Sequence, residues 1–382
     1  MNASSMAAPA YSVAQQVARS IKPHFTRHLA ATGYSVKEPA PLPDDEVMAA
    51  IIDAAFWASL RREEGFSPKI SLAFVPPERS AHPLLLAHAL PLVPEALARL
   101  APAVERAGIH LGVWGGQREL VVWGTTRSLP PYCFVLEVIS PGLLVLKHSP
   151  GENSGKFGNI AVLEGDKVKI LAVHGNGQRN RTAQLRSLLE LASIGEPGSD
   201  TNILPRLAIS MRAHGRGGTL LFVPGDSTEW RESIRSVSYN VDPPFTQLAE
   251  LMRTSSTEQN RSLWRASIRD CVEAIAGLTA VDGATVITHD YRVLAFGAKI
   301  RRRGNSPAVE KVLLIEPVED SAVEIIDPTQ LGGTRHLSAT QFAQDQHQAI
   351  ALVASQDGRF TLLAWSEDDN MVQAHRMETV LV

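Results

Sequence analysis

The C-terminal half of the sequence alternates between helical and strand patterns, and this alternation limits the possible folds more than any other feature. From Arg261 to Ala280, apolar residues such as Ile268, Val272 and Ile275 recur at helical spacing and form one apolar face. Further helices are expected at 204–213, 246–253 and 337–346, and strands at 219–223, 284–288, 293–298, 312–317, 349–354 and 360–365. Helices that alternate with short strands predict an α/β fold, in which helices flank a sheet.

The N-terminal half has a different order, with helices before a strand-rich section. Helices are expected at 46–61 and 93–107, the second kinked or divided by Pro102, and strands at 71–75, 110–114, 119–123, 133–139, 143–147, 159–163 and 167–173. Gly, Pro and polar turns separate these strands. We therefore expect an α+β domain in this half.

The chain of 382 residues is long enough for two domains, because single domains usually span about 100–200 residues. The strand pattern stops over residues 174–203, where an expected helix at 183–194 precedes the turn-rich segment 195–199. We expect a flexible N-terminal segment over 1–45, an α+β domain over 46–200, an α/β domain over 201–370 and a C-terminal tail over 371–382.

Composition excludes several classes of protein. The formal net charge of −3 comes from well-mixed acids and bases, so no nucleic-acid partner is expected. The two cysteines, Cys133 and Cys271, have no metal-ligand spacing, which fits a reducing, cytoplasmic setting. The most apolar stretch, 81–100, is broken by three prolines, and residues 1–26 lack the apolar run of a secretory signal. We therefore expect no association with a membrane.

A first candidate motif is Asp282-Gly283-Ala284, which lies between an expected helix and an apolar strand. The carboxylate of Asp282 is a hard oxygen ligand suited to Mg²⁺ or Mn²⁺. Gly283 has no side chain, so a base or ribose can approach the backbone there. An isolated tripeptide of this kind is more often a plain turn with an exposed aspartate.

A second motif, Gly333-Thr334-Arg335-His336, precedes the helix expected from Leu337. Helix N-termini carry unpaired N–H groups and attract phosphate. Thr334 adds a hydroxyl, Arg335 a bidentate guanidinium and His336 a further donor. Alone, such a loop also reads as a turn with a threonine cap.

In this order, and about 50 residues apart, the two motifs resemble the diadenylate cyclase (DAC) domain family. The resemblance covers roughly 204–365, and includes the early strand Gly217–Val223 and Ser355-Gln356 after a later strand. It implies a DAC-like mixed sheet flanked by helices over 201–370. It also implies a nucleotidyltransferase that joins two ATP molecules into the second messenger cyclic di-AMP and releases two pyrophosphates.

The family resemblance also implies a set of site residues. The implied catalytic residues are Asp282, Arg335 and His336, and the implied metal ligand is Asp282. The implied nucleotide-binding residues are Gly283, Ala284, Gly333, Thr334, Arg335, His336 and Ser355. The implied cofactor is Mg²⁺ or Mn²⁺. Each subunit of a face-to-face pair presents one ATP, so self-association through the cyclase domain is expected, as a dimer or a larger assembly. Asp282 is expected to help activate the ribose 3′-hydroxyl while residues 334–336 hold the triphosphate.

Two residues depart from the family pattern. Leu337 stands where the family has a second arginine, and Gln356 where some members have an acid. Loss of one charged hydrogen bond to phosphate costs about 1.5–3 kcal/mol. The basic residues of 301–303, or Arg359, are possible replacements, although a solvated loop is the simpler interpretation of 301–303. The alternatives are therefore a catalytically weak or inactive DAC-like nucleotide sensor, or an enzyme that makes a different dinucleotide.

The N-terminal half resembles the DACNV type of sensor domain, which precedes some cyclase domains. The residues that carry this resemblance are 56–65, Gly112-Val113-Trp114 and Val122-Trp123-Gly124. The resemblance implies a regulatory domain with a ligand that the sequence does not identify. Trp57, Trp114 and Trp123 either line a sensor pocket or, as we favour, pack in the core.

Overall fold

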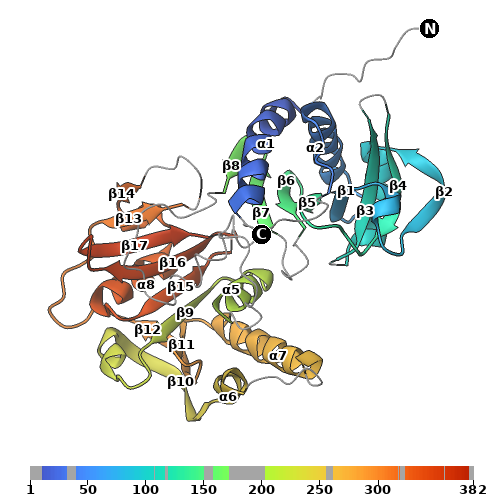
Figure 1. Cartoon of the computed structure of the whole chain (residues 1–382). Helices are drawn as coiled ribbons and strands as arrows, with labels where there is room; N and C mark the ends of the chain where they lie inside the picture. Colours follow the sequence, from blue (N-terminus) through green and yellow to red (C-terminus); the bar gives the residue numbers. More distant parts are fainter. Residues whose placement is uncertain are drawn as a thin grey trace, which may run out of the picture. The chain divides into compact units, whose positions relative to one another are not determined.

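The computed structural model describes residues 11–31, 40–106, 108–116, 119–149, 158–171, 203–254, 261–316, 318, 323–356 and 358–377. Among these residues, those up to Leu171 form one compact unit and those from Ile203 on form another. Each unit has its own sheet and its own helices (Figure 1). The helix expected at 183–194 and the turn-rich segment at 195–199 lie outside the described residues.

The N-terminal unit is built on an eight-stranded sheet in the order β2-β4-β3-β1-β5-β6-β7-β8. The strands are β1 (Ile70–Phe74), β2 (Leu84–Pro91), β3 (His110–Gly116), β4 (Glu119–Thr126), β5 (Phe134–Ser140), β6 (Leu143–His148), β7 (Gly158–Glu164) and β8 (Lys167–Ile170). The helices are α1 (Val13–Ala31), α2 (Asp45–Ser59) and α3 (Pro94–Val104), with a short 3₁₀ turn, η1 (Pro77–Arg79). Only β1 and β3 run parallel, and the other neighbours pair antiparallel.

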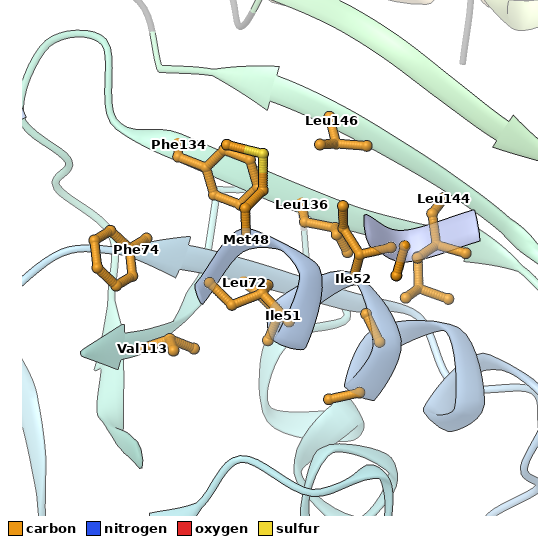
Figure 2. Packing of buried hydrophobic residues seen from close by; sticks show 14 of the residues in the cluster. Met48, Ile51, Ile52, Leu72, Phe74, Val113, Phe134, Leu136, Leu144 and Leu146 are labelled. Atoms are coloured by element: carbon orange, nitrogen blue, oxygen red, sulfur yellow. The ribbon is translucent and has the colours of Figure 1, made fainter. Parts of the chain in front are cut away.

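Helix α2 packs its apolar face on the middle of this sheet. The helix begins at a capping aspartate, Asp44, whose side chain accepts a hydrogen bond from the N–H of Val47 at 2.8 Å. Figure 2 shows the side chains of α2 against those of β1, β3, β5 and β6; the labelled residues are Met48, Ile51, Ile52, Leu72, Phe74, Val113, Phe134, Leu136, Leu144 and Leu146. The alternation of the strands sends every second residue to this face.

The expectation of a flexible segment over residues 1–45 is wrong for residues 13–31, which form α1. Val17, Ile21 and Phe25 follow one another at helical spacing, and their side chains are almost completely buried in the core. Tyr11 stacks on Phe56 of α2 with ring centroids 3.8 Å apart. The Ala- and Ser-rich composition concealed this apolar stripe.

The tryptophans of the N-terminal unit have different environments. Trp123 is buried, and its Nε1 donates to the carbonyl of Val75 at 2.8 Å. Trp114 packs against Phe74 with ring centroids 4.8 Å apart, whereas 39% of Trp57 is exposed. The core interpretation therefore holds for Trp123, while Trp57 lies at the surface.

The C-terminal unit is built on a nine-stranded mixed sheet in the order β10-β12-β11-β9-β15-β16-β17-β13-β14. The strands are β9 (Gly218–Val223), β10 (Ile234–Phe245), β11 (Ala284–Thr288), β12 (Val293–Ile300), β13 (Val312–Ile315), β14 (Glu324–Ile326), β15 (Ile350–Ala354), β16 (Phe360–Ser366) and β17 (Met371–Arg376). The helices are α5 (Ile203–Ala213), α6 (Gln247–Arg253), α7 (Arg261–Thr279) and α8 (Thr334–Asp345), with the 3₁₀ turns η3 (Glu229–Ser233) and η5 (Pro328–Gln330).

Helices cover both faces of this second sheet (Figure 1). On one face, Phe342 of α8 shares a hydrophobic cluster with Leu221 of β9 and Val353 of β15. The other face meets α7, because a β-carbon on Gly218 would lie 2.6 Å from the carbonyl oxygen of Thr279. A mixed sheet with helices on both faces, preceded by an α+β unit, confirms the expected fold class.

The expected C-terminal tail at 371–382 is wrong for residues 371–376, because these form β17 between β16 and β13. The polar residues Gln373 and His375 disguise this strand, yet both are buried and their side chains lie 3.1 Å apart. Among the described residues, none of the helices is long and apolar enough to span a membrane.

Candidate functional site

The topology of the C-terminal sheet brings three chain segments to one edge. Strands β9 and β11 are parallel, so both begin at this edge, with Thr219 beside Ala284. Strand β15 runs antiparallel to β9 and ends there, with Ala354 beside Gly218. The residues just before β11 and just after β15, Asp282-Gly283 and Ser355, therefore come together although they are far apart in sequence.

These segments and the start of α8 line a cavity of about 420 Å³. Its lining residues are Thr219, Asp282, Gly283, Ala298, Lys299, Ile300, Gly333, Thr334, Arg335, His336, Ser338, Val353, Ala354 and Ser355. All residues expected at the site line this cavity except Ala284, which is buried as the first residue of β11. The volume lies in the range of about 300–1,000 Å³ that is usual for small-molecule pockets.

Lys299 is the charged residue of the cavity lining that sequence reasoning missed. It belongs to β12, which pairs antiparallel with β11 and sets Ala298 beside Ala284. The Nζ of Lys299 lies 2.6 Å from Oδ2 of Asp282. This hydrogen bond and the charge of Lys299, with a smaller contribution from Arg335, hold the pKa of Asp282 below its ordinary value. Asp282 is thus a carboxylate at neutral pH, and 91% of its side chain is exposed.

Helix α8 directs its N-terminus at the same cavity. The helix begins at Thr334 and not at Leu337, so the motif forms its first turn instead of a preceding loop. The sequence did not reveal this start because the capping position is held by Gly333, which has no capping side chain. The first N–H groups of a helix have no acceptor within the helix and carry a partial positive charge. This end of α8 therefore has the geometry of an anion site.

Arg335 is exposed and lies against the start of β9. Its Nη1 is 3.0 Å from the position that a β-carbon on Gly217 would take, so the glycine leaves space for the guanidinium. Arg335 and Asp282 both line the cavity, and the charge of Arg335 contributes to the lowered pKa of Asp282.

His336 lies on the inner side of α8 and also lines the cavity. Only 2% of the residue is exposed, and its Nε2 lies 3.2 Å from Oγ1 of Thr361. A β-carbon on Gly332 would overlap Nδ1 of the ring. The imidazole therefore packs between β16 and the loop before α8.

The backbone at position 283 requires a glycine. Its φ is +118°, a conformation that residues with side chains rarely adopt. A β-carbon there would lie 2.5 Å from the carbonyl carbon of Gly297 in β12. The close approach of β11 and β12 therefore accounts for this glycine.

The residues of the cavity fit a metal ion only in part. Among the residues that the structure describes, no three His, Cys, Asp or Glu side chains gather as a metal-binding group. Asp282 supplies one exposed carboxylate, and Thr334 and Ser355 supply hydroxyls. Mg²⁺ in phosphate-transfer sites is commonly held by one or two carboxylates together with substrate phosphates. This donor set fits an ion that arrives with a nucleotide and does not fit a metal cage made of protein alone.

The arginines considered as replacements for a second phosphate donor do not line the cavity. Arg301 Nε donates to the carbonyl of Glu232 at 3.0 Å, and Arg303 Nε donates to the Glu232 carboxylate at 2.6 Å. Arg301 and Arg303 are thus held by hydrogen bonds to Glu232 of η3, just before β10.

Comparison with known proteins gives a family match for part of the N-terminal unit. Residues 37–127 match the family described as "Probable sensor domain DACNV", which confirms the resemblance expected for this half. A crystal structure of a double cysteine mutant of DacA from Staphylococcus aureus is similar to this chain at 13% sequence identity. The match covers 46% of this chain and 85% of that one, with a TM-score of 0.25, a value too low to support an argument. The curated proteins include no match.

Proposed function

We propose that the C-terminal unit is a diadenylate cyclase, which condenses two ATP molecules into cyclic di-AMP and releases two pyrophosphates. The observation that carries this proposal is the convergence of an exposed carboxylate, Asp282, and the N-terminus of α8 with Arg335 on one cavity of about 420 Å³. The two motifs that suggested the function are separate in sequence but share this one site.

The cavity residues are suited to binding and orienting a triphosphate. The open first turn of α8, Thr334 and Arg335 offer N–H, hydroxyl and guanidinium donors to phosphate oxygens. Ser355 and the backbone at Gly283 also line the cavity and, in this proposal, bind the nucleoside. His336 acts as a positioning residue, because its buried ring supports the loop that leads into α8.

Asp282 is the residue that would hold a divalent cation together with the phosphates. A bound Mg²⁺ or Mn²⁺ supplies positive charge that neutralises the triphosphate. The pKa of Asp282, lowered chiefly by Lys299, keeps its side chain ionised in the free protein, and the carboxylate is the form that binds a divalent cation.

The reaction requires two copies of the site. In each half-reaction, the ribose 3′-oxygen of one ATP forms a bond with the α-phosphorus of the other. The bond from that phosphorus to the pyrophosphate oxygen breaks, and the 3′-hydroxyl proton passes to solvent. One cavity holds one ATP in this scheme, so a second subunit must present the other ATP in line.

The second candidate function is a nucleotide sensor of the same fold without turnover. Two observations favour it: Leu337 stands where the family has a second arginine, and Asp282 is already paired with Lys299. In either case, the match of residues 37–127 to a probable sensor domain supports regulation by a ligand of the N-terminal unit.

The test is to incubate the purified chain with ATP and Mn²⁺ or Mg²⁺ and to identify the products by mass spectrometry. An Asp282→Asn variant serves as the control, because it removes the carboxylate charge with little change in shape. We expect cyclic di-AMP and pyrophosphate from the unmodified chain and at most traces from the variant. ATP binding without any product selects the sensor function, and equal rates for the two proteins contradict the role of Asp282.

A further inference from the structure

The lining of the cavity includes a cationic side chain, Lys299, to which neither the two motifs nor the comparisons assign a role. Lys299 of β12 lines the cavity together with the first residues of α8, and its Nζ donates to Oδ2 of Asp282 at 2.6 Å. Lys299 and Arg335 are the lysine and arginine residues among the cavity's lining residues, whereas Leu337 lies outside the lining. The site thus keeps two cationic side chains, one of them from a strand and not from the helix.

We propose that Lys299 binds the phosphates of the nucleotide and so supplies the charge that Leu337 does not. This inference deepens the proposed function and rests on it. In the free protein the ammonium group of Lys299 pairs with Asp282, and on binding of a nucleotide it exchanges that carboxylate for a phosphate oxygen. The exchange releases the Asp282 carboxylate for a cation that accompanies the phosphates.

The physical chemistry of the pair supports such an exchange. The side chains of Lys299 and Asp282 are 43% and 91% exposed, and ion pairs between exposed groups contribute little to stability. Breaking this ion pair therefore costs little free energy. A lysine also has a flexible stem and three donors that are free to rotate, so its ammonium group can move between nearby anions. A triphosphate carries several negative charges, whereas Asp282 carries one.

A purely structural role is the alternative that the experiment must exclude. Lys299 lies on β12 and Asp282 lies just before β11, which pairs with β12, and an ion pair at such a position can simply join neighbouring segments. In that case, removing Lys299 would affect the binding of all adenine nucleotides equally. If Lys299 binds phosphates, the loss grows with the number of phosphates.

The experiment measures the dissociation constants of AMP, ADP and ATP by calorimetry for the full chain and its Lys299→Met variant, first in EDTA. We expect ATP binding to weaken about 10- to 100-fold and AMP binding to weaken less, because a charged hydrogen bond to phosphate is lost. Lys299→Arg should retain most of the affinity. Lys311→Met is the matched control, since Lys311 is exposed just before β13 and outside the cavity.

Asp282→Asn provides a second, independent readout. Without a divalent cation, Asp282 competes with phosphate for Lys299, so the variant should bind ATP more tightly than the unmodified chain in EDTA. The double variant with Lys299→Met should lose that gain, because the two residues act through each other. Circular dichroism of each variant identifies any loss of folding, and the gain expected for Asp282→Asn cannot arise from misfolding.

The outcomes separate this inference from the proposed function. If the unmodified chain binds ATP but Lys299→Met binds all three nucleotides as the unmodified chain does, the role of Lys299 is refuted and the proposed function stands. Equal losses for AMP and ATP assign Lys299 a structural role and also refute the inference. If the unmodified chain binds no ATP in either EDTA or Mg²⁺, both proposals fail.

Discussion

The replacement of Gly283 by alanine tests the geometry of the candidate site without any assumption about its ligand. The backbone of Gly283 has a φ of +118°, where a side chain adds strain of about 1–3 kcal/mol. The new β-carbon would also lie 2.5 Å from the carbonyl carbon of Gly297 and 2.9 Å from the amide nitrogen of Ala298. These are backbone atoms of β12 that no rotamer change can move, and overpacking of this kind costs about 1–3 kcal/mol. Together the two effects predict a loss of about 2–6 kcal/mol.

The assay is equilibrium unfolding in urea followed by far-ultraviolet circular dichroism. For an unfolding slope of about 1–3 kcal/mol per molar urea, the midpoint of the C-terminal unit should fall by about 1 M or more. Gly277→Ala is the matched control, because Gly277 lies exposed in α7 with no atom within 4 Å of its added β-carbon. Alanine should stabilise the helix there by about 0.5–1 kcal/mol. If Gly283→Ala unfolds at the same urea concentration as the unmodified chain, the contact with β12 is not the reason for this glycine.

Two further predictions concern the N-terminal unit. Phe25→Ala should lower the free energy of unfolding of this unit, measured in urea, by about 3–5 kcal/mol, because Phe25 is 1% exposed in the core. Gln16→Ala, on the exposed side of α1, should change that free energy by less than about 0.5 kcal/mol. An equally small effect of both changes would contradict the docking of α1. Burial lowers the pKa of His110 and His148 in the folded protein. Below about pH 6.5 these histidines therefore bind protons more readily in the unfolded state, and acid destabilises the folded unit. The urea midpoint of this unit should therefore be lower at pH 5 than at pH 7.5. An equal or higher midpoint at pH 5 would contradict the effect expected of these two buried histidines.

The sequence predicted the elements whose apolar residues form a helical stripe or a short unbroken run. Helix α7 is an example of the first, and strands β9, β11 and β15 are mostly apolar runs that are buried along their length. Strand β10 was missed, because this edge strand buries few of its twelve residues and carries no clear alternation. Strand β17 was missed for the opposite reason, since its polar residues are buried and bonded to one another.

Only the site residues that belong to a local sequence motif could be predicted from the sequence. The two motifs identified Asp282, Thr334 and Arg335, because a glycine next to a polar residue at an element boundary is a local signal. Lys299 gave no such signal. Its place in the cavity depends on the register between β11 and β12, and its sequence neighbours are those of an ordinary strand. The burial of His336 likewise depends on Thr361, which comes from β16.

Under the proposed function, the charge balance of the cavity would link nucleotide binding to metal binding. Lys299, Arg335 and the N-terminus of α8 contribute positive charge, and Asp282 contributes the single carboxylate among the lining residues. A divalent cation alone must displace Lys299 from Asp282 and leave the ammonium group beside another positive charge. A triphosphate alone attracts Lys299 and leaves Asp282 without its partner. When both bind, each charge has an opposite neighbour, so each ligand strengthens the binding of the other, and thermodynamic linkage requires the two effects to be equal.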